Sequence, residues 1–162
     1  MLKSQHRVQS MSMIHQKLYQ EKSLSSIEMK DYFKDLASYI INVFDAEDRI
    51  QVIFEMGHIE LDVDTAIPIG LIVNELLTNS LKYAFPSMKE GIVRIGLKKE
   101  GSQLHLKVAD NGIGKCEIEK SIGTGFGTQL IGLLTKQLDG KMELLVDNGT
   151  IISFEFQTNK AA

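Results

Sequence analysis

The chain has 162 residues, of which 43% are hydrophobic and 24% are charged, and its formal net charge is -3. These proportions are ordinary for a globular protein, and the length suits one domain with a substantial core. The negative charge argues against a nucleic-acid partner, so any anionic ligand must be bound by local groups. The one cysteine, Cys116, cannot form an internal disulfide, and no apolar run is long enough to span a bilayer. We therefore expect a cytoplasmic module without a membrane segment, cut from a longer protein.

The first two predicted elements are helices. Apolar residues recur every three or four positions from Ser4 to about Glu21, which predicts a helix with the narrow stripe used in helix pairs. Ser25 and Glu28 have the spacing of a capping box at the start of a second helix, which fades at residues 45–48. Its broad apolar face consists of Ile27, Tyr32, Phe33, Leu36, Ile40 and Phe44. We expect this helix to pack in the core.

Alternating apolar residues predict six strands, and two turn sequences favour hairpins. Glu100-Gly101-Ser102 and Asp147-Asn148-Gly149 are the two turns. The strands span residues 50–56, 59–63, 91–99, 103–109, 141–146 and 150–157. A helix with a buried face at Leu130, Ile131, Leu134 and Leu138 precedes the last pair, and Gly140 is expected to end it. Mostly antiparallel strands with separate helices favour an α+β two-layer sandwich over a doubly wound sheet.

The central predicted helix combines polar and apolar residues. Asp64 or Thr65 could cap it, Pro68 is tolerated in its first turn, and it runs to about Ala84. At helical spacing Glu75, Asn79 and Lys82 share one face, opposite an apolar side. That apolar side consists of Leu76, Leu77, Leu81 and Ala84. Two readings are open: a solvated face of an ordinary amphipathic helix, or a set of polar groups aimed into a cleft.

Glycine-rich segments follow the central helix. Gly123, Gly125 and Gly127 precede a helix whose free amides could attract phosphate, although a flexible loop is an equal alternative. The spacing is neither that of a Walker loop nor that of the dinucleotide fingerprint.

Asp110 ends an apolar strand, where its carboxylate can accept a hydrogen bond from an exocyclic amine such as that of adenine. Gly112 and Gly114 leave room beside it for a flat ring. The alternative is an ordinary Asp-Asn-Gly turn.

Three motifs in this order resemble the N, G1 and G2 boxes of the GHKL ATPase superfamily. They are Asn74-Glu75-x-x-Thr78-Asn79-x-x-Lys82-Tyr83, Asp110-x-Gly112-x-Gly114 and Gly123-x-Gly125-x-Gly127. The resemblance covers about residues 27–156, within which residues 71–86 and 123–140 look most like the catalytic, ATP-binding domain of sensor histidine kinases. Residues 7–19 resemble the second helix of the dimerisation and phosphoacceptor region in a non-classical subfamily. The resemblance implies a Bergerat-type sandwich at residues 25–162, with a mixed, largely antiparallel sheet and helices on one face, after a partial dimerisation helix at residues 1–24.

The resemblance also implies a role for each motif residue. Asn79 would ligate Mg²⁺ between the ATP phosphates, and Glu75 would orient a metal-bound water or act as a base toward the attacking histidine. Lys82 would contact phosphate, and Tyr83 would lie near the nucleotide. Asp110 would recognise the adenine amine, helped through water by Thr150. The remaining residues implied in the pocket and lid are Gly112, Gly114, Gly123, Thr124, Gly125, Gly127 and Thr128.

The implied function is transfer of the ATP γ-phosphoryl group to a histidine outside this chain, in a two-component system with a response regulator. His6 starts an acceptor-like tripeptide, but the residues after it match the second helix, so surface or interface roles are favoured for His6 and His15. A homodimer through the N-terminal helix is possible. One alternative is an anti-sigma-type serine kinase, against which the N-terminal helix argues. The other is a nucleotide-binding regulatory module without kinase activity, against which Glu75 and Asn79 argue.

Overall fold

The computed structural model describes residue 12 and residues 26–85, 90–114 and 126–158. Apart from Ser12, which is helical, the predicted helix at residues 4–21 lies outside the described residues, as do His6, His15 and Cys116. None of the helices in the described ranges is both long and apolar enough to cross a membrane.

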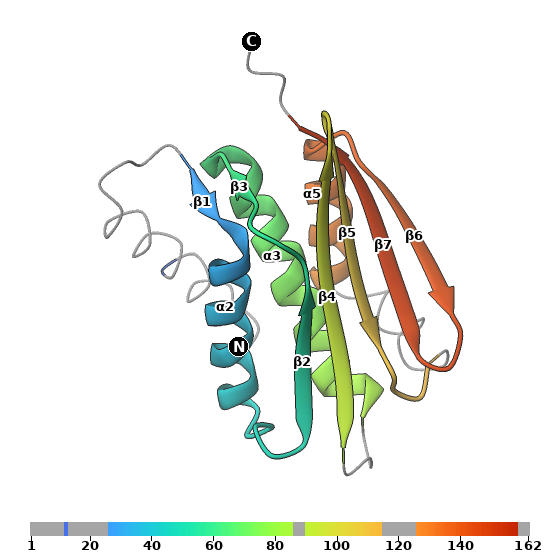
Figure 1. Ribbon diagram of the computed structural model, residues 1–162. Helices are drawn as coiled ribbons and strands as arrows, with labels where there is room; N and C mark the ends of the chain where they lie inside the picture. The colour runs from blue at the N-terminus through green and yellow to red at the C-terminus, as the bar shows by residue number, and fades with distance from the viewer. Residues whose placement is uncertain (1–11, 13–25, 86–89, 115–125, 159–162) are drawn as a thin grey trace.

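The fold has two layers, with helices packed on one face of a sheet (Figure 1). The sheet has five strands in the order β2-β4-β5-β7-β6, and a separate antiparallel pair joins β1 to β3. The strands are β1 Ile27–Glu28, β2 Ile50–Glu55, β3 Glu60–Leu61, β4 Gly91–Glu100, β5 Gln103–Asp110, β6 Lys141–Val146 and β7 Thr150–Gln157. The helices are α2 Met29–Val43, α3 Val63–Asn79 with the π-helical turn η1 Ser80–Ala84, and α5 Phe126–Gln137. The predicted α+β sandwich is confirmed.

The sheet is mixed because β2 and β4 pair in parallel, whereas the other three pairs are antiparallel. Both predicted hairpin turns are present. Gly101 has a φ of 59° between β4 and β5, and Asn148 and Gly149 have φ values of 48° and 125° between β7 and its partner β6. Asn and Gly are the residues that adopt such backbone conformations most readily.

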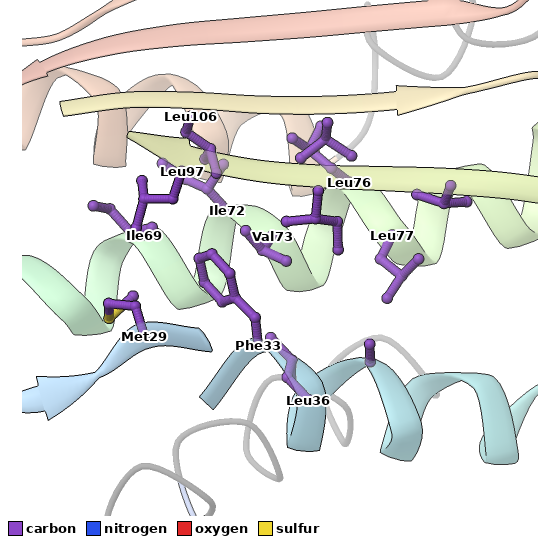
Figure 2. Packing of buried hydrophobic residues seen from close by; sticks show 14 of the residues in the cluster. Met29, Phe33, Leu36, Ile69, Ile72, Val73, Leu76, Leu77, Leu97 and Leu106 are labelled. Atoms are coloured by element: carbon purple, nitrogen blue, oxygen red, sulfur yellow. The ribbon is translucent and has the colours of Figure 1, made fainter. Parts of the chain in front are cut away.

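The core lies between the sheet and α3, which packs against both α2 and α5. Figure 2 shows Phe33 and Leu36 of α2 facing Ile69 and Val73 of α3, with the sheet residues Leu97 and Leu106 on the other side of that helix. Leu97 and Leu106 are partners in the β4–β5 register. Protein thus surrounds most of helix α3, which explains why the helix is apolar on most sides.

Close packing between α2 and α3 depends on one glycine. A Cβ atom at Gly70 would overlap the hydroxyl and ring of Tyr32, which is fully buried. The hydroxyl of Tyr32 has no hydrogen-bond partner among the described residues, and burial raises its pKa.

The predicted capping box at Ser25 and Glu28 is wrong, because α2 begins at Met29. Glu28 is itself the N-cap, and its Oε2 accepts a hydrogen bond from the Asp31 backbone N–H at 2.7 Å. Ile27 belongs to β1 rather than to the helix, since it pairs with Leu61. A long-range strand pair therefore determines where this helix starts.

The ends of the other two helices also differ from the prediction. Asp62, rather than Asp64 or Thr65, precedes α3, and its carboxylate accepts a hydrogen bond from the Thr65 hydroxyl at 2.7 Å. Pro68 consequently lies inside the helix rather than in its first turn.

At the end of α5 the left-handed residue is Asp139, with a φ of 49°, rather than Gly140. Gly140 is required for a different reason, because a Cβ atom there would lie 2.5 Å from Cδ1 of Phe156.

Candidate functional site

A cavity of about 170 Å³ lies between the helix layer and the sheet, at the end of the sheet where β5 stops and β7 starts. Residues from α3, η1, β5, α5, β6 and β7 line it: Leu76, Asn79, Ser80, Val108, Asp110, Ile131, Gly132, Met142, Leu144, Thr150 and Ile152. Among these lining residues Asp110 is the one ionisable side chain. An apolar cavity with a few polar groups suits a flat ring that carries a hydrogen-bond donor.

Both carboxylate oxygens of Asp110 accept hydrogen bonds. Oδ1 accepts from the Gly112 backbone N–H at 3.0 Å, and Oδ2 accepts from the Ser80 hydroxyl at 3.2 Å. Burial raises the pKa of Asp110, and hydrogen bonds from Gly112, Ser80 and the Thr150 backbone oppose that rise. The result is a partly desolvated carboxylate in a defined orientation, with acceptor capacity left for a ligand.

Thr150 lies directly opposite Asp110 in the β5–β7 register and is buried. Its hydroxyl oxygen has no hydrogen-bond partner among the described residues, although the residue lines the cavity. Buried hydroxyls normally have a partner, so this one has hydrogen-bonding capacity for a ligand or a bridging water.

The π-helical turn η1 connects α3 to this site. The carbonyl oxygen of Ala84 accepts a hydrogen bond from the Ile113 backbone N–H at 3.0 Å, and a Cβ atom at Gly112 would overlap that oxygen. The turn therefore holds the segment after Asp110 close to the end of α3. Single π-helical turns are frequent at functional sites.

The polar residues of the central helix are not all in one place. Asn79 lines the cavity, whereas Glu75, Lys82 and Tyr83 are not among its described lining residues. Asn74 and Glu75 are 1% and 4% exposed, so the interpretation of this helix as an ordinary solvated surface is wrong. The α-helical spacing that predicted a common face for Lys82 does not hold, because the wider turn begins at Ser80.

The glycines of the second motif follow Asp110 closely, but neither is among the described residues that line the cavity. Gly114 has a φ of 73°, and a Cβ atom there would lie 3.2 Å from the carbonyl oxygen of Gly149. Gly149 in turn approaches the carbonyl of Asp110 so closely that a side chain would not fit. The segment after β5 and the β6–β7 turn thus pack against each other at the cavity.

Part of the third motif cannot be placed. Gly123, Thr124 and Gly125 lie outside the described residues, and Gly127 is buried near the start of α5. Thr128 belongs to α5, and its side chain is likewise outside the described structure.

Sequence reasoning missed Ser80 and most of the apolar wall. The missed residues are Leu76, Ser80, Val108, Ile131, Gly132, Met142, Leu144 and Ile152. The apolar ones follow the same periodicity as core residues, so no local signal separates them. For Ser80, the available signal was its position next to Asn79.

A mixed sheet covered by helices on one face, with a half-buried carboxylate at the end of an apolar cavity, defines a ligand-binding domain of the α+β class. The chain belongs to the family described as "Histidine kinase-, DNA gyrase B-, and HSP90-like ATPase", whose model matches residues 64–160. Membership of this family implies ATP binding. A second family model, described as "Histidine kinase", matches residues 1–44.

Curated relatives include two histidine kinases. The chain is 31% identical over 137 residues to blue-light-activated histidine kinase 2 of Erythrobacter litoralis, covering 76% of this chain and 40% of that protein. It is 28% identical over 149 residues to the sensor histidine kinase PdtaS of Mycobacterium tuberculosis, covering 88% of this chain and 29% of that protein. The chain thus spans less than half the length of these relatives.

Solved structures of histidine kinases share the fold. The Erythrobacter litoralis EL346 blue-light activated histidine kinase superimposes with a TM-score of 0.83 at 26% identity, covering 98% of this chain and 55% of that one. The Acinetobacter baumannii histidine kinase AdeS has a TM-score of 0.65 at 14% identity, covering 94% and 77% of the two chains. The second likeness concerns the fold alone.

Proposed function

We propose that this chain is the ATP-binding catalytic region of a two-component sensor histidine kinase, which transfers the γ-phosphoryl group of ATP to a histidine outside this chain. The observation that carries the proposal is the half-buried Asp110 carboxylate, which lines the apolar cavity of a domain from this ATPase family. Adenine would occupy the cavity, with its exocyclic amine donating to Asp110 and with the Thr150 hydroxyl as a further partner, directly or through water.

The residues present fit a magnesium ion that is bound mainly through phosphate. The described residues contain no group of three or more His, Cys, Asp or Glu side chains that could hold a metal, whereas the amide of Asn79 lies at the cavity. Mg²⁺ keeps several waters and takes few protein ligands, so one amide oxygen is sufficient. When bound, the ion neutralises phosphate charge. In this proposal Asn79 would hold the ion, and Glu75 would orient a metal-bound water or accept a proton from the attacking histidine.

Other residues serve the phosphates and the base. Lys82 would contact phosphate, and Tyr83 would lie near the nucleotide. By the resemblance to the family, Gly112 and Gly114 would shape the pocket, and Gly123, Thr124, Gly125, Gly127 and Thr128 would belong to the lid. The amides at the start of α5 favour an anionic group there.

The proposal extends to the arrangement of the chain and its partners. Residues 1–24 would form part of a dimerisation helix, and residues 25–162 the catalytic domain; the match of residues 1–44 to a histidine kinase model supports the first part. A homodimer through this helix, a response regulator that receives the phosphoryl group and a cytoplasmic location complete the proposal.

Isothermal titration of the full chain with a non-hydrolysable ATP analogue and Mg²⁺ tests the nucleotide site. We expect saturable one-site binding, and a folded chain that binds nothing would overturn the proposal. Phosphotransfer in trans to a histidine-bearing helical hairpin tests the reaction itself. An acid-labile product is expected, whereas an acid-stable phosphoserine would favour the alternative of a serine kinase.

Asn79→Ala is expected to remove the magnesium dependence of nucleotide binding. The affinity for the ATP analogue in Mg²⁺ should fall about tenfold, which corresponds to about 1.4 kcal/mol, because the ion loses its side-chain ligand. Titrations with and without Mg²⁺ measure the effect. Asn42→Ala, on an exposed position of α2, is the matched control and should bind as the parent does. An undiminished magnesium effect in Asn79→Ala would contradict the assigned role.

A further inference from the structure

Ser80 holds the carboxylate that the proposed function assigns to adenine. It is the first residue of η1, it is 5% exposed, and its hydroxyl donates to Oδ2 of Asp110 at 3.2 Å. The other oxygen, Oδ1, accepts from the Gly112 backbone N–H at 3.0 Å. The two donors come from segments that are far apart in the sequence, so the carboxylate is fixed from both sides.

The hydrogen bond from Ser80 restricts the plane of the carboxylate. Asp110 is the last residue of β5, and backbone groups of Gly112 and Thr150 also hydrogen-bond its carboxylate. Rotation about the Cβ–Cγ bond is otherwise only weakly restricted. A bond from Ser80 to the other oxygen opposes that rotation. An ionised carboxylate has about four acceptor positions, so the one left by Gly112, Ser80 and Thr150 is aimed in a defined direction.

Ser80 is placed to act on the base rather than on the fold alone. It lines the cavity itself, and replacement by alanine removes one oxygen atom. Ser80 also follows Asn79 directly in the chain. The start of η1 therefore connects Asn79, which is assigned to the magnesium ion, with Asp110, which is assigned to adenine.

We propose that Ser80 is a positioning residue for base specificity: its hydroxyl orients Asp110 toward the exocyclic amine of the purine. The inference rests on the proposed function, because it takes adenine as the occupant of the cavity. A ligand without that amine gains nothing from the orientation of the carboxylate, whereas ATP does. Ser80 should therefore affect discrimination between these two ligands.

The test compares ATP with purine riboside triphosphate, which lacks the exocyclic amine, by calorimetric titration of the full chain in Mg²⁺. We expect the parent chain to prefer ATP. In Ser80→Ala the affinity for ATP should fall about tenfold, while affinity for the amine-free analogue changes by less than about twofold. Ser80→Thr keeps the hydroxyl and should keep the preference. If the alanine variant does not fold, Ser80→Cys, with similar volume and a weak donor, should show the same selective loss.

The outcomes separate this inference from the proposed function. A parent chain that binds neither nucleotide overturns both. A parent chain that prefers ATP, together with a Ser80→Ala chain whose preference is unchanged, overturns the role of Ser80 alone. An equal loss for both ligands in Ser80→Ala identifies a purely structural effect and also overturns it.

Discussion

Replacing Asp110 with asparagine is expected to lower ATP affinity by about a hundredfold, or about 2.7 kcal/mol, without destabilising the unliganded chain at neutral pH. Asparagine retains an oxygen that can accept from Gly112, as Oδ1 of Asp110 does at 3.0 Å. It loses the charge, however, and its amide group presents donors to the donating amine of adenine. Calorimetric titration with the ATP analogue measures the loss. Asp48→Asn, at an exposed position, is the control and should bind normally.

The effect on stability follows from the pKa of Asp110, which burial raises above its ordinary value in the folded chain. The folded state therefore favours the neutral carboxyl group. This preference adds to the free energy of unfolding at pH values below the ordinary aspartate pKa. The added stability is lost as the pH rises through the raised pKa of Asp110 in the folded chain. At pH 7 the ionised group destabilises the fold, so thermal unfolding should show Asp110→Asn to be more stable than the parent, with a smaller difference in acid.

Nucleotide affinity should have the opposite pH dependence, because the ionised form of Asp110 accepts the hydrogen bond from adenine. Affinity for the ATP analogue is expected to fall in the parent as the pH is lowered through the raised pKa, and to stay flat in Asp110→Asn over that range. Equal binding by both chains at neutral pH would contradict the assignment of Asp110 to the base.

Gly70→Ala should decrease the free energy of unfolding by about 1–3 kcal/mol, although alanine is the better helix former. The new methyl group would overlap the hydroxyl and ring of Tyr32, which is fully buried between α2 and α3. Urea denaturation of the unliganded chain measures the change. Gly132→Ala in α5 is the matched control, because nothing lies within 4 Å of its Cβ position, and it should stabilise the chain by up to about 1 kcal/mol.

A second substitution separates overpacking from a general effect of alanine. The Tyr32 hydroxyl is the nearest atom to the added methyl group and has no partner among the described residues. Tyr32→Phe alone should therefore be close to neutral, and combined with Gly70→Ala it should recover part of the lost stability. A Gly70→Ala chain that is as stable as Gly132→Ala would disprove the clash.

Much of the fold could be predicted from local patterns. Alternation located the strands, and Gly101 and the Asn148-Gly149 pair marked two hairpins because their backbone conformations are ones that few other residues adopt. The position of Asp110 at the end of an apolar strand indicated a held carboxylate, and its hydrogen bond from the Gly112 backbone is local, two residues apart. The proposed roles of Glu75, Lys82 and Tyr83 remain predictions that rest on the resemblance.

What the sequence determined by itself is thus the five strands of the main sheet, the hairpins and the candidate base-binding residue, because each depends on neighbours in the chain. Tertiary structure alone decided the rest. The β2–β4 pair is parallel through contacts between distant segments, and α2 starts at Met29 because Ile27 pairs with Leu61. Helix α3 widens at Ser80, where Ser80 donates a hydrogen bond to Asp110 and Ala84 accepts one from Ile113, both from a segment that comes later in the chain. No local sequence pattern predicts these long-range hydrogen bonds. They place a helix whose sequence resembles that of a surface helix beside the cavity of the candidate site.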